Sequence, residues 1–272
     1  MPYDRLKELK RVTDHYAGDD LQKRFSAIIS GPTNSGKSYI NSTARFPVHI
    51  DSFDPGGSKC LAPWIKSGDV VVDTAYENED PFAPTAFAAW QKNFEIRLAT
   101  NYFDMFGTYC IDSLSTFSDA VMNSQLKSQS RAGESPRRNK DYMPQKTLIV
   151  NNIRKMLNLP CDFILTAHLK EIVEKETYDT STGISTKIVN YRLHVVGQAV
   201  VTIPLLFDEL WVLQGKGEKP DRKILTNSLG KYLARSRLCT NGKLDSIEPP
   251  NIKKILKKAG FDHTDKPKLE LS

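Results

Sequence analysis

The sequence predicts an α/β fold with a mainly parallel central sheet flanked by helices, plus a β-hairpin insertion. Short runs that are apolar throughout, as strands buried on both faces of a sheet are, alternate with stretches of helical spacing. A glycine-rich loop joins the first of these runs to a helical stretch. Of the 272 residues, 39% are hydrophobic and 26% are charged. This composition supplies a core and excludes a disordered chain.

Strands are expected where apolar residues run without interruption, and helices where large apolar residues recur every three or four positions. The expected strands are residues 25–30, 47–53, 70–72, 109–112, 163–167, 209–213 and 231–235. Helices are expected after residue 38, at 84–106, from about 115, at 144–158 and at 250–258. Residues 171–195 alternate around a Thr-Ser-Thr-Gly turn at 180–183, which predicts the hairpin.

The charge is distributed unevenly along the chain. We expect an N-terminal appendage at 1–22, a folded core at 23–240 and a basic C-terminal tail or helix at 241–272. The net charge is +6, and residues 214–272 hold 14 Lys and Arg against 7 Asp and Glu. A basic end on a near-neutral body favours a polyanionic partner, although a solvated basic helix would explain it equally well.

Membrane and metal-scaffold classes find no support in the sequence. No window approaches the roughly 20 apolar residues of a membrane span, and the N-terminus lacks the apolar core of a signal peptide. The four cysteines form no CxxC pair, which argues against a zinc ribbon. We therefore expect a cytoplasmic protein with reduced thiols that does not bind membranes.

The strongest motif is the glycine-rich loop. It matches the P-loop pattern Gly-x4-Gly-Lys-Ser, with a strand before it and a helical stretch after it. Backbone N–H groups of such a loop wrap a phosphate, Lys37 would reach the β- and γ-phosphates, and Ser38 would ligate Mg²⁺. The predicted ATP-binding residues are Gly31, Pro32, Thr33, Asn34, Ser35, Gly36, Lys37, Ser38 and Tyr39.

A carboxylate for the metal is expected at the end of strand 109–112. Asp112 fits a Walker B residue that holds Mg²⁺ through water. Ser113 follows it, where many motor ATPases carry a glutamate that activates water, so this chain takes its base from elsewhere or hydrolyses slowly. The acids nearest other strand ends are Asp51, Asp54 and Glu77. Asp54 precedes a Pro-Gly-Gly turn that would lift it over the nucleotide.

In the order of these motifs, the chain resembles the RecA-like recombinase ATPases. It is most similar to short phage-encoded members, the Sak-type single-strand annealing ATPases that are often labelled "AAA family ATPase". The resemblance covers about residues 24–258. The P-loop is specific only to the superfamily, whereas the Ile-Asp-Ser strand end, the acid-Pro-Gly-Gly turn and the polar tip after 163–167 narrow it to the family.

The resemblance implies roles for further residues. Asp54 would stand near the position of the catalytic acid, with Glu77 as the alternative. Thr166 and His168, at the tip of strand 163–167, would occupy the position that senses the γ-phosphate.

The resemblance also implies a homo-oligomer, a ring or filament with sites between subunits. Arg235 and Arg237 on the late strand would reach a neighbour's γ-phosphate. No arginine close in sequence to the P-loop or to Asp112 offers itself within the chain; the nearest are Arg45 and Arg97.

Two segments match the loops that line the DNA channel of such folds, 128–142 and about 171–195. The first carries Lys127, Arg131, Arg137, Arg138 and Lys140. The second carries Lys170, Lys175, Tyr178, Lys187, Tyr191 and Arg192, together with three glutamates. These residues would track and stack single-stranded DNA. A solvated loop and a packed hairpin would explain them as well.

The sequence and the resemblance together predict a DNA-dependent ATPase that uses ATP and Mg²⁺ in phage-type recombination or single-strand annealing. Its partners would be single-stranded DNA and single-strand-binding or other replication proteins, in the bacterial host cytoplasm if it is phage-encoded. Two alternatives stay open: a DNA-translocating motor of the packaging or helicase type, and a nucleotide-binding assembly or switch protein with little turnover.

Overall fold

The computed structural model describes residues 4–18, 24–179, 184–195, 197–215, 221–238 and 242–270. Its strands form a ten-stranded sheet with the order β10-β8-β7-β1-β5-β4-β2-β3, to which β6 adds through β5 and β9 through β7. The strands are β1 Ser26–Gly31, β2 Val48–Ser52, β3 Val70–Asp73, β4 Thr108–Asp112, β5 Asp162–Asp179, β6 Ile184–Leu193, β7 Glu209–Gln214, β8 Lys223–Leu225, β9 Arg235–Ser236 and β10 Ile247–Glu248.

The strands from β7 to β3 are parallel, and β6, β8, β9 and β10 pair antiparallel with their neighbours. The predicted α/β fold, with its mainly parallel sheet and its hairpin, is confirmed. Because β5 lies between β1 and β4, the strand that precedes the P-loop and the strand that ends in Asp112 are not neighbours in the sheet.

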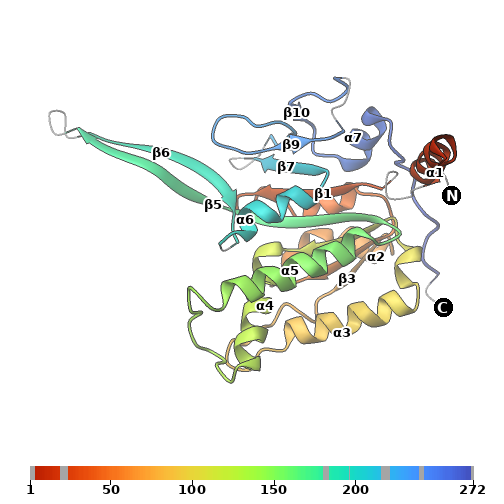
Figure 1. The fold of residues 1–272 in the computed structure, drawn as a ribbon. Coiled ribbons are helices and arrows are strands. Elements are labelled where there is room, and N and C mark those ends of the chain that lie inside the picture. Colours follow the sequence, from red (N-terminus) through yellow and green to blue (C-terminus); the bar gives the residue numbers. More distant parts are fainter. Residues whose placement is uncertain are drawn as a thin grey trace.

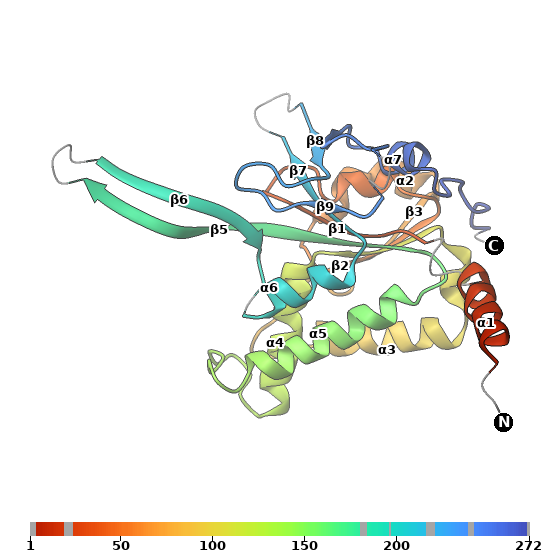
Figure 2. The same cartoon turned by 45° about the horizontal axis from the view of Figure 1, so that its top comes forward.

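Helices cover both faces of the sheet (Figures 1 and 2). The helices are α1 Arg5–Gly18, α2 Ala62–Lys66, α3 Ala86–Ala99, α4 Leu114–Ser128, α5 Tyr142–Leu157, α6 Ala199–Thr202 and α7 Ile252–Ala259. Short 3-10 helices are η2 Tyr39–Thr43, η3 Gly57–Leu61, η4 Tyr102–Met105 and η5 Pro204–Leu206. The P-loop is thus followed by a single 3-10 turn.

The alternation of side chains along β1 divides the core into two layers. Ile28 packs into the cluster that contains the apolar faces of α3, α4 and α5, whereas Ala27 and Ile29 pack into the cluster that contains α7. Both layers are apolar, which explains why the parallel strands read as uninterrupted hydrophobic runs.

Two expected elements differ in extent. The helix expected at 84–106 ends at Ala99, because Asn101 adopts a left-handed conformation (φ 53°) and a 3-10 turn follows it. The strand expected at 231–235 is reduced to Arg235–Ser236. Tyr232 instead makes isolated bridges to Leu229 and Tyr191.

The two ends of the chain differ in how they meet the core. Helix α1 has no buried residue. In the C-terminal part, β10 pairs with β8, and α7 buries Ile252, Ile255 and Leu256 in the same cluster as Trp211 of β7. Residues of β10 and α7 therefore contribute to the folded body of the molecule. Both expected segment boundaries, at 22/23 and 240/241, involve residues outside the described ranges.

The hairpin is a continuation of the sheet. Strand β5 runs for 18 residues, and its second half pairs with β6 from Leu169–Leu193 to Asp179–Ile184. At about 3.3 Å per residue, the 11 residues of β5 from 169 to 179 span roughly 35 Å. Figures 1 and 2 show this arm leaving the body of the molecule. The turn at 180–183 lies outside the described residues.

The basic loop between α4 and α5 is anchored by a buried ion pair. Arg131 is 9% exposed and donates to Asp141 (3.0 Å) and to Glu134 (2.6 Å). Asp141 also accepts from the backbone N–H of Arg137 (2.6 Å). These contacts show that Arg131 holds the loop in place.

Among the helices of the described residues, none has the length and apolar character that crossing a membrane requires.

Candidate active site

The P-loop lies at the carboxyl edge of the parallel strands, where α/β proteins bind their ligands. Strand β1 ends at Gly31, between β5 and β7. Only glycine fits there, because a Cβ would lie 2.8 Å from the carbonyl oxygen of Leu213 and would also clash with Oγ of Ser35. Gly36 has φ +98°, a conformation that side chains rarely adopt. Pro32, Thr33, Asn34 and Tyr39 are exposed around this loop.

The side chain of Lys37 is held over the loop by two backbone carbonyl groups of the loop. Its side chain is 93% buried, and Nζ donates to the carbonyl oxygens of Pro32 (2.9 Å) and Gly31 (3.2 Å). Burial lowers the pKa of Lys37, while the charges of Asp112 and Asp54 act in the opposite direction. Lys37 thus lies within electrostatic reach of both predicted acids.

Asp112 has the environment of a metal-side carboxylate. It is 2% exposed, and it accepts hydrogen bonds from Thr166 and Ser38. Burial raises the pKa of Asp112 despite these hydrogen bonds, so a cation beside it would stabilise the charged form.

Space for such a cation lies beside Gly57. A Cβ at Gly57 would stand 3.6 Å from Oγ of Ser38, 3.7 Å from Oδ2 of Asp112 and 3.5 Å from Cβ of Asp54. The absence of a side chain there keeps these oxygens accessible. The described residues contain no group of three or more His, Cys, Asp and Glu side chains suited to a metal. A hydroxyl, a carboxylate and phosphate oxygens are, however, the ligands that Mg²⁺ takes at a P-loop. Ser38 and Asp112 therefore fit Mg²⁺.

Asp54 is positioned by three side chains. Its Oδ1 accepts from Thr116 Oγ1 (2.6 Å) and Ser113 Oγ (2.9 Å), and its Oδ2 lies 3.0 Å from Nε2 of His168. Burial raises the pKa of Asp54, but the hydrogen bonds from His168, Thr116 and Ser113 outweigh it and the net shift is downward. Since an ionised carboxylate only accepts, Nε2 of His168 carries the proton.

The sequence placed Asp54 and His168 in the site, and the structure brings them together there. His168 is the register partner of Gly31 across β5 and β1, so it stands beside the first residue of the P-loop. Of the acceptor positions on Asp54, its described contacts leave one on Oδ2. That position is available to a water molecule.

The two other acids named as candidates have structural roles. Glu77 accepts from Ser52 Oγ (2.7 Å) and from the N–H of Gly56 (2.9 Å), which fixes the turn that carries Asp54. Asp51 is fully buried and receives hydrogen bonds from Trp90, Tyr109, Arg97 and His49. Asp51 is therefore fully engaged in the core, whereas Glu77 is engaged by the turn that carries Asp54.

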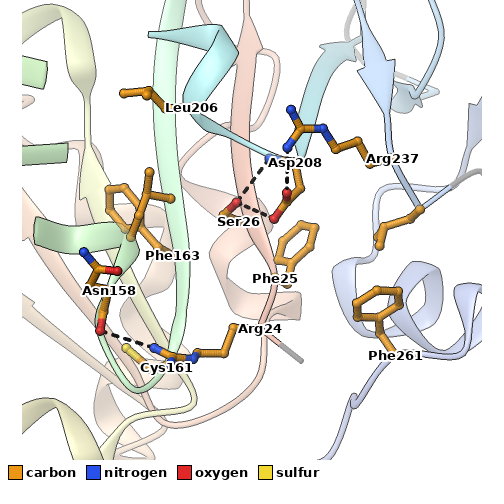
Figure 3. Close-up of a pocket in the computed structure, with 12 residues that line it drawn as sticks. Arg24, Phe25, Ser26, Asn158, Cys161, Phe163, Leu206, Asp208, Arg237 and Phe261 are labelled. Carbon is orange, nitrogen blue, oxygen red and sulfur yellow. Dashed lines mark hydrogen bonds and ion pairs between the residues drawn. The ribbon is translucent and has the colours of Figure 1, made fainter. Parts of the chain in front are cut away.

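Arg235 and Arg237 lie at the opposite edge of the sheet from the P-loop of their own chain. Nη2 of Arg235 donates to the carbonyl oxygens of Pro204 and Phe207, both at 2.8 Å. Arg237 pairs with Asp208 (3.0 Å) and lines a cavity of about 440 Å³ at the amino ends of β1 and β5, which Figure 3 shows. Their role in a neighbouring subunit's site stays a prediction.

Three contributors to the site were missed by sequence reasoning. Ser113 and Thr116 hold Asp54, and their spacing at the start of α4 is that of a capping box, which is a readable signal. Arg222 packs on Gly36, with its Cδ and Nε 3.1 Å from where a Cβ would lie. An arginine within the chain therefore does reach the P-loop, although it is not one of those close to the loop in sequence. Arg222 and Gly36 are 186 residues apart in the sequence.

Filling the space beside Gly57 should weaken metal-dependent nucleotide binding. Its added Cβ would make only ordinary van der Waals contacts, so Gly57→Ala should fold normally. We expect the affinity for Mg²⁺-ATP to fall several-fold and the affinity for ATP in EDTA to stay unchanged, as measured by equilibrium binding. An equal loss in EDTA would show that this space does not serve the metal.

The fold and the site together define a P-loop core of the α/β class: a P-loop after a central strand, and an acid at the end of a non-adjacent parallel strand. No protein-family model matches the sequence, and no curated protein matches it either.

The chain matches a number of solved structures, among them the following two. The flagellar accessory protein FlaH from Methanocaldococcus jannaschii is 17% identical, with 84% of this chain and 89% of that chain covered and a TM-score of 0.40. An ATPase from the type III secretion system of pathogenic bacteria is 16% identical, with a TM-score of 0.49. That match covers 87% of this chain but only 61% of the ATPase.

Proposed function

We propose that this protein is an ATPase that binds ATP with Mg²⁺ and hydrolyses it to ADP and phosphate. The observation that carries the proposal is the convergence of Lys37, Asp112 and Asp54 at the P-loop. The experiment that tests it is the release of phosphate from ATP by the purified protein in the presence of Mg²⁺. Binding of ATP without any release would leave a nucleotide switch as the function.

Each residue of the site has a distinct task in this reaction. The P-loop backbone and Lys37 would bind the phosphates and neutralise charge that develops on the γ-phosphate. Ser38 and Asp112 would hold Mg²⁺, which would supply positive charge to the phosphates when bound. Asp54, kept ionised and oriented by His168, would accept a hydrogen bond from the attacking water through its remaining position on Oδ2.

The occupancy of Asp54 favours a second candidate, a nucleotide-dependent switch with slow turnover. Three donors already satisfy this carboxylate, and the downward shift of its pKa weakens it as a base. Turnover that remains slow with every DNA cofactor would favour the switch. Strong stimulation by DNA would favour the ATPase.

For the physiological role we propose DNA-dependent action in recombination or single-strand annealing, as the resemblance to the Sak-type family suggests. In support, Arg137, Arg138 and Lys140 are exposed on the anchored loop. Figures 1 and 2 show this loop and the β5–β6 arm on the same side of the molecule. A strand of DNA between them would meet positive charge close to the nucleotide edge of the sheet.

Of the two tyrosines that the sequence suggested for stacking on DNA bases, Tyr191 is already stacked within the protein. Tyr191 stacks on Tyr232 with a centroid distance of 4.8 Å and an interplanar angle of 6°, and Lys231 lies over its ring. Tyr191 therefore packs the base of the arm. The side chains of Lys175, Tyr178 and Lys187 lie outside the described part of the chain.

Neutralising the exposed loop should weaken binding to single-stranded DNA. In the variant Arg137→Gln, Arg138→Gln and Lys140→Gln, each lost phosphate contact should reduce the slope of log affinity against log salt by about 0.7. Fluorescence anisotropy over a salt series measures this slope. The double variant Lys254→Ala and Lys257→Ala, on the exposed face of α7, is the control and should keep it. An unchanged slope in the triple variant would assign the loop to solvent.

We also propose that the protein forms a homo-oligomer in which Arg237 reaches a neighbour's γ-phosphate. Arg237→Ala should still bind ATP and lose hydrolysis by about 10³–10⁵-fold, as arginine fingers do. Arg235→Ala is the less selective variant, since Arg235 also holds two backbone carbonyl groups. Mixing Arg237→Ala with Lys37→Ala protein should restore part of the activity, because the two defects lie on different sides of a shared site. A concentration-independent rate and no restoration would refute the shared site.

A further inference from the structure

Arg222 reaches the P-loop through the antiparallel edge of the sheet. It directly precedes β8, which pairs with β7, and β7 pairs with β1. Lys223 is the register partner of Gln214, the last residue of β7. Arg222, one residue earlier in the chain, therefore lies at the carboxyl edge of the sheet. The 3.1 Å separation of its Cδ and Nε from a Cβ at Gly36 shows that this side chain packs directly on the loop.

The Nε atom of Arg222 is buried and has no hydrogen-bond partner among the residues that the structure describes. A buried donor without an acceptor is destabilising, and most such groups in proteins have a partner. The side chain also borders a cavity of about 270 Å³, together with Tyr39 and Ile40. A ligand in this cavity would lie beside the side chain of Arg222.

We propose that Arg222 is a further nucleotide-binding residue, which donates from its guanidinium to the diphosphate part of the bound nucleotide. This inference rests on the proposed ATP binding. A guanidinium presents a planar fork of N–H donors that matches phosphate oxygens. The P-loop backbone cradles the α- and β-phosphates, and Lys37 extends toward the γ-phosphate. Arg222, which packs on Gly36, therefore serves the part of the nucleotide that ADP and ATP share.

The assignment separates Arg222 from a γ-phosphate finger. A finger acts on the charge of the transition state and changes turnover, whereas a contact to the diphosphate changes the affinity for ADP and ATP by the same factor. It also connects strands β7 and β8 to the nucleotide, because Arg222 would be fixed in place when its donor is satisfied.

The test uses Arg222→Met, which keeps an alkyl stem against Gly36 and removes the guanidinium. We expect the Kd values for Mg²⁺-ADP and Mg²⁺-ATP to rise by a similar factor, roughly 10- to 100-fold. The kcat at saturating ATP should stay close to that of the wild type. Lys223→Met, which removes the same charge from a side chain paired with Asp221 (2.8 Å), is the matched control and should change neither Kd. Arg222→Lys keeps the charge without the fork and should recover only part of the affinity.

Three results would overturn the inference. Equal Mg²⁺-ADP affinity in Arg222→Met and the wild type would show that Arg222 makes no contact to the diphosphate. A loss of affinity confined to ATP, or a loss of kcat alone, would assign Arg222 to the γ-phosphate. A lower melting temperature of Arg222→Met without nucleotide, combined with unchanged affinities, would give Arg222 a purely structural role. Failure of the wild-type protein itself to bind either nucleotide would instead refute the proposed function, and this inference with it.

Discussion

Lys37→Ala should abolish ATP hydrolysis while the protein stays folded. Its ammonium group would bind the phosphates that carry the developing charge, and removing one such preorganised donor costs about 10²–10³-fold in turnover in other enzymes. The truncation leaves the carbonyl oxygens of Gly31 and Pro32 without this donor, so we also expect a small loss of stability, about 1 kcal/mol. Phosphate release and thermal unfolding measure the two effects separately.

The control for this variant is Lys66→Ala. Lys66 is exposed on α2, and its removal changes the net charge by the same amount. It should leave both hydrolysis and the melting temperature unchanged. Full activity of Lys37→Ala would contradict the assignment of residues 31–38 as a phosphate-binding loop, because the motif assigns this lysine directly to the phosphates.

Asp54→Asn should retain ATP binding and lose turnover by about 10²–10⁴-fold, the usual contribution of a positioned acid or base. The asparagine keeps an oxygen for the hydroxyl groups of Ser113 and Thr116, so the turn that carries it should stay in place. It places no negative charge beside the water, and its NH2 group faces His168 with a donor where the carboxylate had an acceptor. Single-turnover hydrolysis, compared with equilibrium binding of ATP, separates the chemical step from affinity.

Glu77→Gln is the matched control for Asp54→Asn, since it makes the same chemical change on a neighbouring acid. Glu77 accepts from Gly56 N–H and Ser52 Oγ, so this variant should mainly lower the melting temperature. The reverse outcome, an active Asp54→Asn and an inactive Glu77→Gln, would move the base to the segment after β3.

The sequence by itself determined the elements whose signals are local. A P-loop needs its glycines within a few residues of a strand end, because the loop geometry at Gly31 and Gly36 forbids a side chain. Uninterrupted apolar runs predicted the parallel strands, since both faces of these strands are buried. Asp112 could be placed because it ends such a run. These features follow from short stretches of backbone and from burial alone.

Only the tertiary structure decided which distant side chains complete the site. Sequence left Asp54 and Glu77 as alternatives, and the packing of the Pro-Gly-Gly turn against α4 and β5 separates them, with Asp54 toward His168 and Glu77 toward the backbone of Gly56. The place of Arg222 beside the P-loop could not be predicted from the sequence, because it depends on the pairing of β8 with β7 and of β7 with β1. Strand pairing joins residues at any separation along the chain, and the direction of a side chain at such a junction is fixed by the sheet and not by its sequence neighbours.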